Sequence, residues 1–370
     1  MRRRYDNRFV FLTFLKGKGL LFGLFFILTV SCAKRDSGEV VFRYANEQPE
    51  AALRSQSMIK FFKEQLEERS NGRIKVELFF GGVLGNEREL MDFVQTGVLQ
   101  GTRGGFFADA NPKFILFTLP FLVDDWDQAQ RLVKSDFTRK INEGAREWGF
   151  HVPATGISQG FRAHTNNKKP IRHPDDLKGL KMRIPGFGGD VMAKLGASPV
   201  SLPGGQIYEN LVSGAIDATE WVGPYNDYFM KFYEAAKYYY YPGWHEPGGG
   251  IELCMNSSWW GSLSNWERAV ITSCSMEEHA AQYEEAQANN GAYLKKLVDE
   301  QGVELKQFGE DIYEGVAGAV AEVYEGVRDH SPLGKKINDH FQATLREVGA
   351  WQAKAEVGYS ALRNQVLGIG

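Results

Sequence analysis

A carboxylate and a tryptophan stand next to each other at the end of a short polar stretch, in the segment I-D-A-T-E-W-V-G-P (216–224). Glu220 can bind a cation or accept hydrogen bonds, and Trp221 can form the wall of a pocket with its large amphipathic ring. Gly223 and Pro224 follow, and we expect them to end regular structure there. This pattern fits the edge of a ligand pocket, but a loop whose tryptophan packs into the core would contain the same residues.

A second segment, P-G-W-H-E-P (242–247), repeats the combination of aromatic, carboxylate and turn residues. Its carboxylate, Glu246, could bind a hard cation together with Glu220, since Na⁺ and Ca²⁺ take carboxylate and backbone carbonyl oxygens. Such a cation could bridge to a carboxylate of a ligand. Two surface acids near aromatic residues would give the same pattern, so the spacing alone does not distinguish a cation site from two unrelated acids.

Two arginines, Arg162 and Arg183, fall in stretches that we expect to be strands in the middle of the chain. A guanidinium is a planar fork that meets a carboxylate with two hydrogen bonds. The usual alternative for one arginine is a surface salt bridge. Arg183 lies between apolar neighbours and precedes the turn G-F-G-G (186–189), which favours a positioned residue. That turn predicts the start of a short helix, whose first amides favour an anion.

One motif points to a different class of protein. G-I-S-Q-G (156–160) matches the nucleophile elbow of serine hydrolases, with Ser158 as the nucleophile. The elbow needs a strand before it and a helix directly after it. The residues that follow, F-R-A-H-T-N-N-K-K-P, are polar and end in proline, so that helix is not predicted. The sequence contains no H-E-x-x-H, no P-loop and no complete dinucleotide fingerprint.

The first 31 residues differ from the rest. Six basic residues and one acidic residue precede an apolar run of 12 residues, Gly19 to Val30. This run is short for a membrane span and has the length of a signal-peptide core. We therefore predict a signal peptide at residues 1–31. Without it the net charge changes from −3 to about −8, and an acidic chain without a basic cluster argues against nucleic acid as a partner.

Cys32 follows the apolar run directly, after the small residue Ser31. This resembles a lipoprotein cleavage site, so we predict a lipid anchor on Cys32 that would tether the protein to a membrane. Thr29 stands where such sites usually carry leucine. Cys254 and Cys274 would remain, and an exported protein permits either a disulfide or two buried thiols.

The remaining chain predicts an α/β fold of two parts, and its 370 residues suffice for two domains. In the N-terminal part, apolar spacing predicts strand, helix, strand and helix, which indicates a largely parallel sheet. Later strands are expected near 150–157, 180–184 and 251–255. From Ser262 onward the pattern is helical, with one run of about 34 residues from Trp266 to Asp299. The N-terminal elements are Val40–Tyr44, Glu50–Arg69, Ile74–Leu78 and 86–96.

Three longer motifs resemble the periplasmic solute-binding proteins of TRAP transporters, the DctP family. They are D-L-K-G-L-K-M-R-I-P-G (176–186), G-A-I-D-A-T-E-W-V-G-P-Y-N-D (214–227) and Y-Y-Y-P-G-W-H-E-P-G (239–248). G-V-L-G-N-E-R-E-L (82–90) and the tail from Trp351 to Tyr359 extend the resemblance over most of the chain. The branch it resembles most binds 2-oxo acids and lactate together with a metal ion.

The resemblance implies a two-lobed periplasmic binding protein with a helix that spans both lobes and a helical C-terminal region. Residues 32–155 would form the N-terminal part of lobe I and residues 156–248 lobe II. Residues 249–370 would supply the return strand of lobe I, the long helix and the C-terminal helices. In some relatives the C-terminal helices swap into a homodimer, and the tail here is long enough for that.

The resemblance also assigns residues. Arg183 falls on the arginine that pairs with the ligand carboxylate, and Arg162 falls where relatives carry arginine or, in the oxo-acid branch, glutamine. Glu220, the backbone of Trp221 and Glu246 fall on the metal and ligand edge, with His245 as the neighbouring alternative to Glu246. The residues expected to cover the ligand from lobe I are Phe106 and Phe107.

The expected function is therefore capture of a small monocarboxylate, a 2-oxo or 2-hydroxy acid, and its delivery to a membrane permease. Arg183 and a bound Na⁺ or Ca²⁺ would hold the ligand, and no bond would be made or broken. The alternatives from other classes are a secreted serine hydrolase that uses Ser158 and a lipoprotein that only scaffolds partners.

Overall fold

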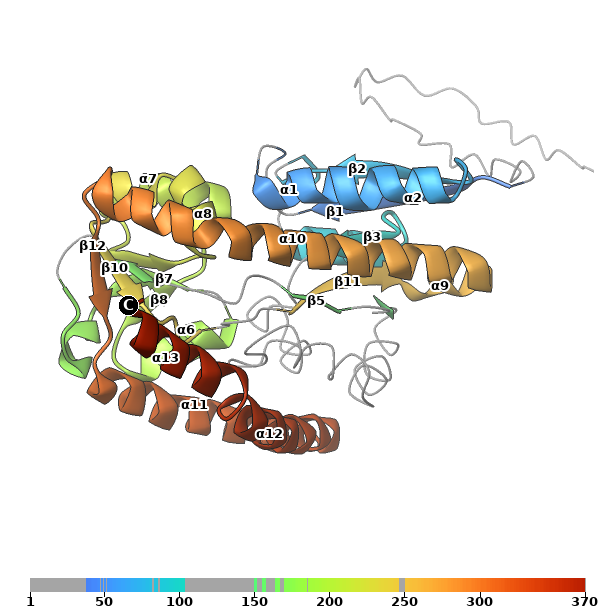
Figure 1. Cartoon of the computed structure of the whole chain (residues 1–370). Coiled ribbons are helices and arrows are strands. Elements are labelled where there is room, and N and C mark those ends of the chain that lie inside the picture. The colour runs from blue at the N-terminus through green and yellow to red at the C-terminus, as the bar shows by residue number, and fades with distance from the viewer. Residues whose placement is uncertain are drawn as a thin grey trace, which may run out of the picture. The chain divides into compact units, whose positions relative to one another are not determined.

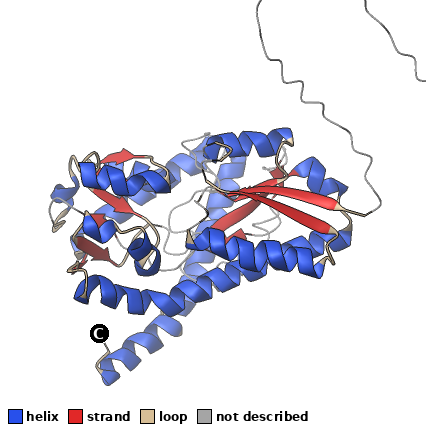
Figure 2. Ribbon diagram, turned by 90° about the horizontal axis from the view of Figure 1, so that it is seen from above, coloured by secondary structure: helices blue, strands red, loops and turns tan. Residues whose placement is uncertain are grey.

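The chain is described from a computed structural model. The described residues are 38–46, 48, 50, 52–81, 83–85, 87–103, 150–151, 155–157, 164–166, 170–184, 186–245 and 250–369. The fold below is that of residues 39–370, which form one compact unit. Its strands form two sheets, which appear as two groups of arrows in Figure 2.

The first sheet has the order β2-β1-β3-β11-β4, with β5 also paired to β11. β1 runs parallel to β2 and β3, as the strand–helix–strand pattern predicts. β11 is antiparallel to β3, β4 and β5, so the sheet is mixed because the chain returns to it late and from the opposite direction. The strands are β1 (Val40–Asn46), β2 (Ile74–Phe79), β3 (Gly101–Arg103), β4 (Phe150–His151), β5 (Thr155–Ile157) and β11 (Gly250–Asn256).

One face of this sheet is covered by the helical segment predicted at 50–69. The segment is continuous but changes pitch, because a π-helical stretch lies between two α-helical ones. Its buried face packs on Phe42 and Tyr44 in one apolar cluster. The helices near this sheet are α1 (Leu53–Ser57), η1 (Met58–Lys63), α2 (Glu64–Arg69), α3 (Glu87–Thr96) and α9 (Ser257–Ser262).

The second sheet has the order β12-β10-β6-β9-β7-β8. β7 lies between β8 and β9 and runs parallel to both, whereas β6 is antiparallel to β9 and to β10. Three parallel strands therefore end at one edge of this sheet. The strands are β6 (His164–Asn166), β7 (Lys181–Arg183), β8 (Ser198–Val200), β9 (Ala218–Glu220), β10 (Tyr238–Tyr241) and β12 (Glu304–Gln307).

Short helices connect these strands, and a larger apolar cluster packs beneath them. The cluster joins residues of β7, β10, α6 and α11 to residues of α3 and β11 from the first sheet. Both sheets therefore share one core. The connecting helices are η3 (Pro174–Leu177), α6 (Gly186–Lys194), η4 (Gly204–Gln206), α7 (Ile207–Ser213), α8 (Pro224–Phe229) and η5 (Phe232–Glu234).

One sequence prediction is wrong in this region. Residues after Ser262 are not all helical, because Glu304–Gln307 forms β12, which gains its partner from β10 in parallel register. Four residues between Gly302 and Gly309 carry little local signal for a strand. The break expected at Gly223 and Pro224 is present, since residues 221–223 belong to no helix or strand, but a helix follows at once. Gly223 is the N-cap of α8 and Pro224 its first residue, a position where the missing N–H is harmless.

The long helix predicted at 266–299 is confirmed as α10 (Asn265–Asp299), with 35 residues. A capping box fixes its start, since Ser264 Oγ accepts from the Glu267 N–H at 3.2 Å and a Glu267 oxygen accepts from the Ser264 N–H at 2.7 Å. α10 contacts η1 and α2 beside the first sheet and α8 beside the second. In Figure 1 it runs past both sheets, so it spans the two lobes.

Three further helices complete the chain: α11 (Glu310–His330), α12 (Pro332–Gln352) and α13 (Glu356–Leu367). α11 packs on α6 and α12. No helix in the described part of the chain has both the length and the apolar character that a bilayer span requires. Cys254 and Cys274 are both buried thiols outside any disulfide, which answers the question that the sequence left open.

Gly204 shows how closely the helices after β8 approach β9. A Cβ atom added to Gly204 would lie 2.3 Å from the Trp221 ring, well inside contact distance. Gly205, the next residue, has open space at the same position. The ring packs in a buried cluster whose other members are Ile207, Leu211, Ile216, Val222 and Phe232. Only a residue without a side chain fits at 204.

Gly204→Ala is therefore expected to destabilise the fold by about 1–3 kcal/mol, the usual cost of overpacking a core. Gly205→Ala is the matched control, and we expect it to be neutral or slightly stabilising. Urea unfolding followed by circular dichroism measures both. Equal stability of the two variants would contradict the packing of Trp221 against Gly204.

Candidate functional site

The site lies where β7, β8 and β9 end. Arg183 is the last residue of β7, Val200 that of β8 and Glu220 that of β9. Because the three strands are parallel neighbours, these ends meet at one edge of the sheet. In open α/β sheets, ligands bind outside the carboxyl ends of the strands. Each of these strands is followed in the chain by a short helix: α6 after β7, η4 after β8 and α8 after β9.

Arg183 is buried, and its guanidinium is held by backbone oxygens. Its Nε donates to the Leu202 carbonyl at 3.2 Å and its Nη1 to the Glu220 carbonyl at 3.1 Å. The guanidinium carbon lies 5.2 Å from the centre of the Trp221 ring, within range of a cation–π contact. These contacts come from the residues after β8 and at the end of β9, so the guanidinium plane is fixed before any ligand binds.

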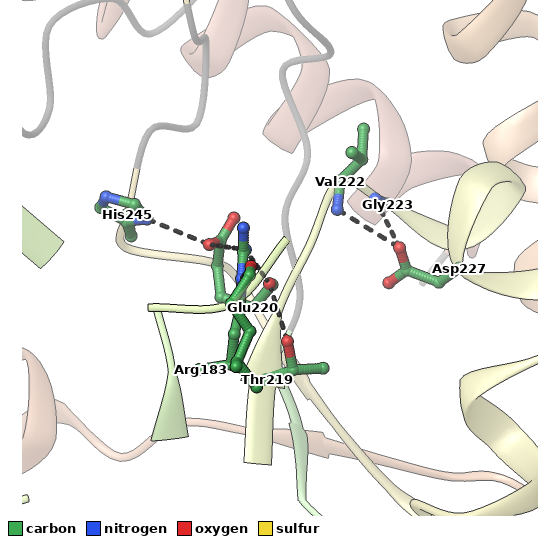
Figure 3. A network of polar contacts seen from close by, with 8 residues as sticks. Arg183, Thr219, Glu220, Val222, Gly223, Asp227 and His245 are labelled. Atoms are coloured by element: carbon green, nitrogen blue, oxygen red, sulfur yellow. Dashed lines mark hydrogen bonds and ion pairs between the residues drawn. The ribbon is translucent and has the colours of Figure 1, made fainter. Parts of the chain in front are cut away.

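Glu220 is completely buried, with a side-chain exposure of 0%. Its Oε2 lies 3.6 Å from Arg183 Nη1 and 3.5 Å from His245 Nδ1, as Figure 3 shows. Both distances exceed those of strong hydrogen bonds, so these contacts are mainly electrostatic. A buried carboxylate is costly without compensating charge, and Arg183 supplies it. Thr219 Oγ1 donates to the Glu220 carbonyl at 3.0 Å and fixes the end of β9 further.

His245 reaches the site from the loop after β10. Its ring lies against α6, where a Cβ atom added to Gly188 would be 2.5 Å from Nε2. Gly188 is one of the glycines after Arg183 in the sequence, and its lack of a side chain leaves room for the imidazole. From the sequence, His245 is only the alternative to Glu246. The structure brings His245 to Glu220, and Glu246 lies outside the described residues.

Trp221 follows Glu220 directly and is 8% exposed. Its ring packs edge-on against Phe232, with 6.4 Å between the ring centres, and Gly204 and Arg183 also lie close to it. The ring thus belongs to the core that supports the site. The backbone of Trp221, which directly follows β9, lies at the edge of the second sheet.

Asp227 is a further buried carboxylate near the site that is not among the site residues predicted from the sequence. This buried carboxylate in α8 accepts from the Val222 and Gly223 N–H groups at 3.3 and 3.1 Å, and from the Tyr239 hydroxyl at 2.6 Å. Burial raises the pKa of its carboxyl to about 7, although these hydrogen bonds lower it. An acidic residue in the first turn after Gly-Pro was the available signal, since such residues often accept from exposed backbone amides at helix starts.

Several predicted site residues lie outside the described residues: Arg162, Phe106, Phe107, Glu246 and Ser158. Cys32 does as well. Among the residues that the structure describes, no three His, Cys, Asp or Glu side chains come together to hold a metal ion. The assembled group is therefore Arg183, Glu220, His245 and the backbone around Trp221. Charges of both signs at a strand edge suit the binding of a small charged solute.

Residues 44–329 match the family model DctP, described as bacterial extracellular solute-binding protein, family 7. A monocarboxylate 2-oxoacid-binding periplasmic protein of Nostoc sp. (strain PCC 7120) is 31% identical over 302 residues, which cover 80% of this chain and 82% of that protein.

Solved structures agree with this family. A TRAP periplasmic solute-binding protein from Colwellia psychrerythraea, with bound calcium and pyruvate, is 26% identical with a TM-score of 0.78. Another from Pseudoalteromonas atlantica T6c, with bound sodium and pyruvate, is 25% identical with a TM-score of 0.78. Each alignment covers 87% of this chain and 99% of the other. The chain thus belongs to the DctP family of bacterial extracellular solute-binding proteins and is a periplasmic solute-binding protein of the TRAP type, not an enzyme.

Proposed function

We propose that this protein captures a small monocarboxylate, a 2-oxo or 2-hydroxy acid, and delivers it to a TRAP membrane permease. The observation that carries the proposal is the Arg183 guanidinium, buried at the edge where three parallel strands end and held there by two backbone carbonyls. The names of the similar proteins support the ligand class, since one binds monocarboxylate 2-oxoacids and two contain pyruvate.

Arg183 is proposed to pair with the carboxylate of the ligand. Charge-assisted hydrogen bonds between guanidinium and carboxylate are short and directional, and they are stronger where water is excluded. The fixed guanidinium plane lowers the cost of binding, because little side-chain freedom is lost when the ligand arrives. Arg162, Phe106 and Phe107 are proposed to complete the ligand site, as the family resemblance implies.

A cation is proposed to bind beside the ligand, held by Glu220, the backbone oxygen of Trp221 and Glu246. The residues fit such an ion, because Glu220 is a fully buried carboxylate at the end of a strand, and carboxylate and backbone oxygens are the ligands that Na⁺ and Ca²⁺ prefer. When bound, the ion supplies positive charge that attracts the ligand oxygens. Bound calcium or sodium in the two pyruvate-containing structures supports this assignment.

The N-terminal segment is proposed to export and anchor the protein, with residues 1–31 as signal peptide and Cys32 as the lipidated residue. The division into lobes at 156 and 249 also stays a proposal. Strand β12 adds residues 304–307 to the second sheet, although the sequence division places this segment after the second lobe.

The C-terminal helices are proposed to pair with those of a second copy. Tyr359, Leu362 and Val366 of α13 follow each other at spacings of three and four residues and are exposed by 65–82%. This spacing places them on one face of the helical end and resembles the apolar seam of a coiled coil. Exposed apolar faces of this kind mark interaction sites.

The role of Arg183 predicts that Arg183→Ala binds pyruvate about 10- to 100-fold more weakly, since a hydrogen bond to a charged group contributes roughly 1.5–3 kcal/mol. Arg183→Lys keeps the charge but not the fork, so we expect an intermediate affinity. Isothermal titration calorimetry measures both variants. Arg328→Ala, which removes an exposed arginine of α11, is the control. Unchanged affinity of Arg183→Ala would refute the assignment.

The cation proposal predicts that protein dialysed against a chelator in potassium buffer loses affinity for pyruvate, and that added Ca²⁺ or Na⁺ restores it. A tenfold loss corresponds to about 1.4 kcal/mol of coupling between ion and ligand. The same titrations with Glu220→Gln should show no response to either ion. If metal-free wild-type protein binds pyruvate with full affinity, the cation does not contribute to ligand binding.

The dimer proposal predicts that Val366→Glu shifts the protein towards the monomer in sedimentation-velocity experiments, because a charge in an apolar seam loses its desolvated contact. Ala361→Glu adds the same charge to α13 away from the seam and should leave the mass unchanged. A monomeric wild-type protein at all concentrations would rule out the pairing.

A further inference from the structure

The backbone of Trp221 is fixed from both sides. On the N-terminal side, the Glu220 carbonyl accepts from Arg183 Nη1 at 3.1 Å and from Thr219 Oγ1 at 3.0 Å. On the C-terminal side, the N–H groups of Val222 and Gly223 both donate to one oxygen of Asp227. The peptide group that joins Trp221 to Val222 is therefore held through its own N–H, while its neighbours on both sides are also held.

The orientation of that peptide group follows from its covalent geometry. The described chain has its cis peptide bond at Tyr241–Pro242, and the bond between Trp221 and Val222 is trans. In a planar trans peptide the C=O and N–H bonds point in opposite directions. Since the Val222 N–H points at Asp227, the Trp221 carbonyl points away from Asp227. The Gly223 N–H also points at Asp227, so the Val222 carbonyl, in the same peptide group, points away from Asp227 as well.

Asp227 lies on the far side of this backbone from the site. Figure 3 shows Asp227 on one side of Val222 and Gly223, and Glu220, Arg183 and His245 on the other. A carbonyl directed away from Asp227 is therefore directed towards the side on which the charged side chains gather. Asp227 itself is 2% exposed and touches none of them through a hydrogen bond.

We propose that Asp227 is a positioning residue, which aims the Trp221 carbonyl into the solute site as a ligand for the bound cation. The inference rests on the proposed function, because it concerns the cation assigned there. Backbone carbonyls bind hard cations well only when they are held in place, since the ion must exchange water for fixed oxygens. Asp227 acts through the peptide group and need not touch the ion or the ligand.

The second oxygen of Asp227 explains why the carboxyl stays in place. It accepts from the Tyr239 hydroxyl at 2.6 Å, and Tyr239 belongs to β10. Behind the pair is a small cavity whose apolar lining includes Phe232, Leu297 and Val303. The carboxyl is thus clamped between the turn after β9 and the strand β10, and its rotation would break three hydrogen bonds.

Positioning of the Trp221 carbonyl requires a hydrogen-bond acceptor at position 227 but does not require that this group be negatively charged. Burial raises the pKa of the Asp227 carboxyl to about 7, so its neutral form is accessible near neutral pH. One oxygen accepts from both N–H groups in either form. Asparagine has the same shape and the same accepting oxygen. Asp227→Asn should therefore preserve the function, whereas Asp227→Ala removes the acceptor and lets the peptide turn.

The test is a calorimetric titration of Ca²⁺ into full-length, metal-free protein at saturating pyruvate, with every variant shown to be folded by circular dichroism. We expect Asp227→Ala to bind Ca²⁺ at least tenfold more weakly than wild type, and Asp227→Asn to stay within threefold. Asp227→Ser, which keeps a shorter polar group, should lie between them. It also serves in place of the alanine variant if that variant does not fold.

Leu297→Ala is the matched control for stability, because Leu297 lines the same cavity but makes no hydrogen bond to the turn. It should lower the melting temperature and leave the Ca²⁺ affinity unchanged, which separates positioning from general destabilisation. Wild-type affinity in Asp227→Ala and Asp227→Ser overturns the inference while the proposed cation site stands. Equal losses in Asp227→Asn and Asp227→Ala also overturn it, because charge would then matter. A wild-type protein that binds no Ca²⁺ removes both the cation site and the inference.

Discussion

The burial of a guanidinium and a carboxylate at adjacent strand ends is the constraint on which the rest of this lobe depends. Arg183 and Glu220 lie in neighbouring parallel strands, and neither reaches bulk water to any large extent. Isolated buried charges are expensive, so each needs the other and both need polar contacts. The Leu202 and Glu220 carbonyls provide them for the arginine. This forces β7, the residues after β8, and β9 to end at the same level.

The residues around Arg183 and Glu220 are arranged so that two large rings can pack against this charged pair. Gly188 and Gly204 carry no side chain where His245 and Trp221 approach, so the imidazole and the indole can enclose the charged pair. Asp227 and Tyr239 then fix the turn that follows Trp221. The half of the site on the second sheet is consequently rigid before binding, and α10, which contacts both lobes, links it to the other half. Rigid binding groups reduce the entropy lost on association.

The sequence predicted these features unequally, and the reasons are physical. Strands β1 and β2, helix α10 and the strand end at Glu220 have strong local periodicity or turn residues, so they could be predicted. Strand β12 has four residues and exists because β10 offers it a partner. The contact of Arg183 with Leu202 and the approach of His245 to Gly188 are likewise long-range consequences of strand order, which a single sequence does not reveal. Asp227 had a local signal, but its importance comes from burial.

The charges of the site residues favour binding of a cation and an anionic ligand together. Glu220 carries one negative charge and already lies beside Arg183 and His245. With Ca²⁺ on Glu220 and Glu246, the two carboxylates, the ion and Arg183 sum to one positive charge, which is unfavourable in a buried site unless another negative charge arrives with the ion. A monocarboxylate brings that charge and gains attraction from both the ion and the guanidinium. Each partner therefore strengthens the binding of the other by the same factor, as linkage requires. Such a site binds the ion alone weakly and the acid alone weakly. It also discriminates against neutral solutes of the same size, because a neutral solute leaves the positive charge of the ion uncompensated in a buried environment.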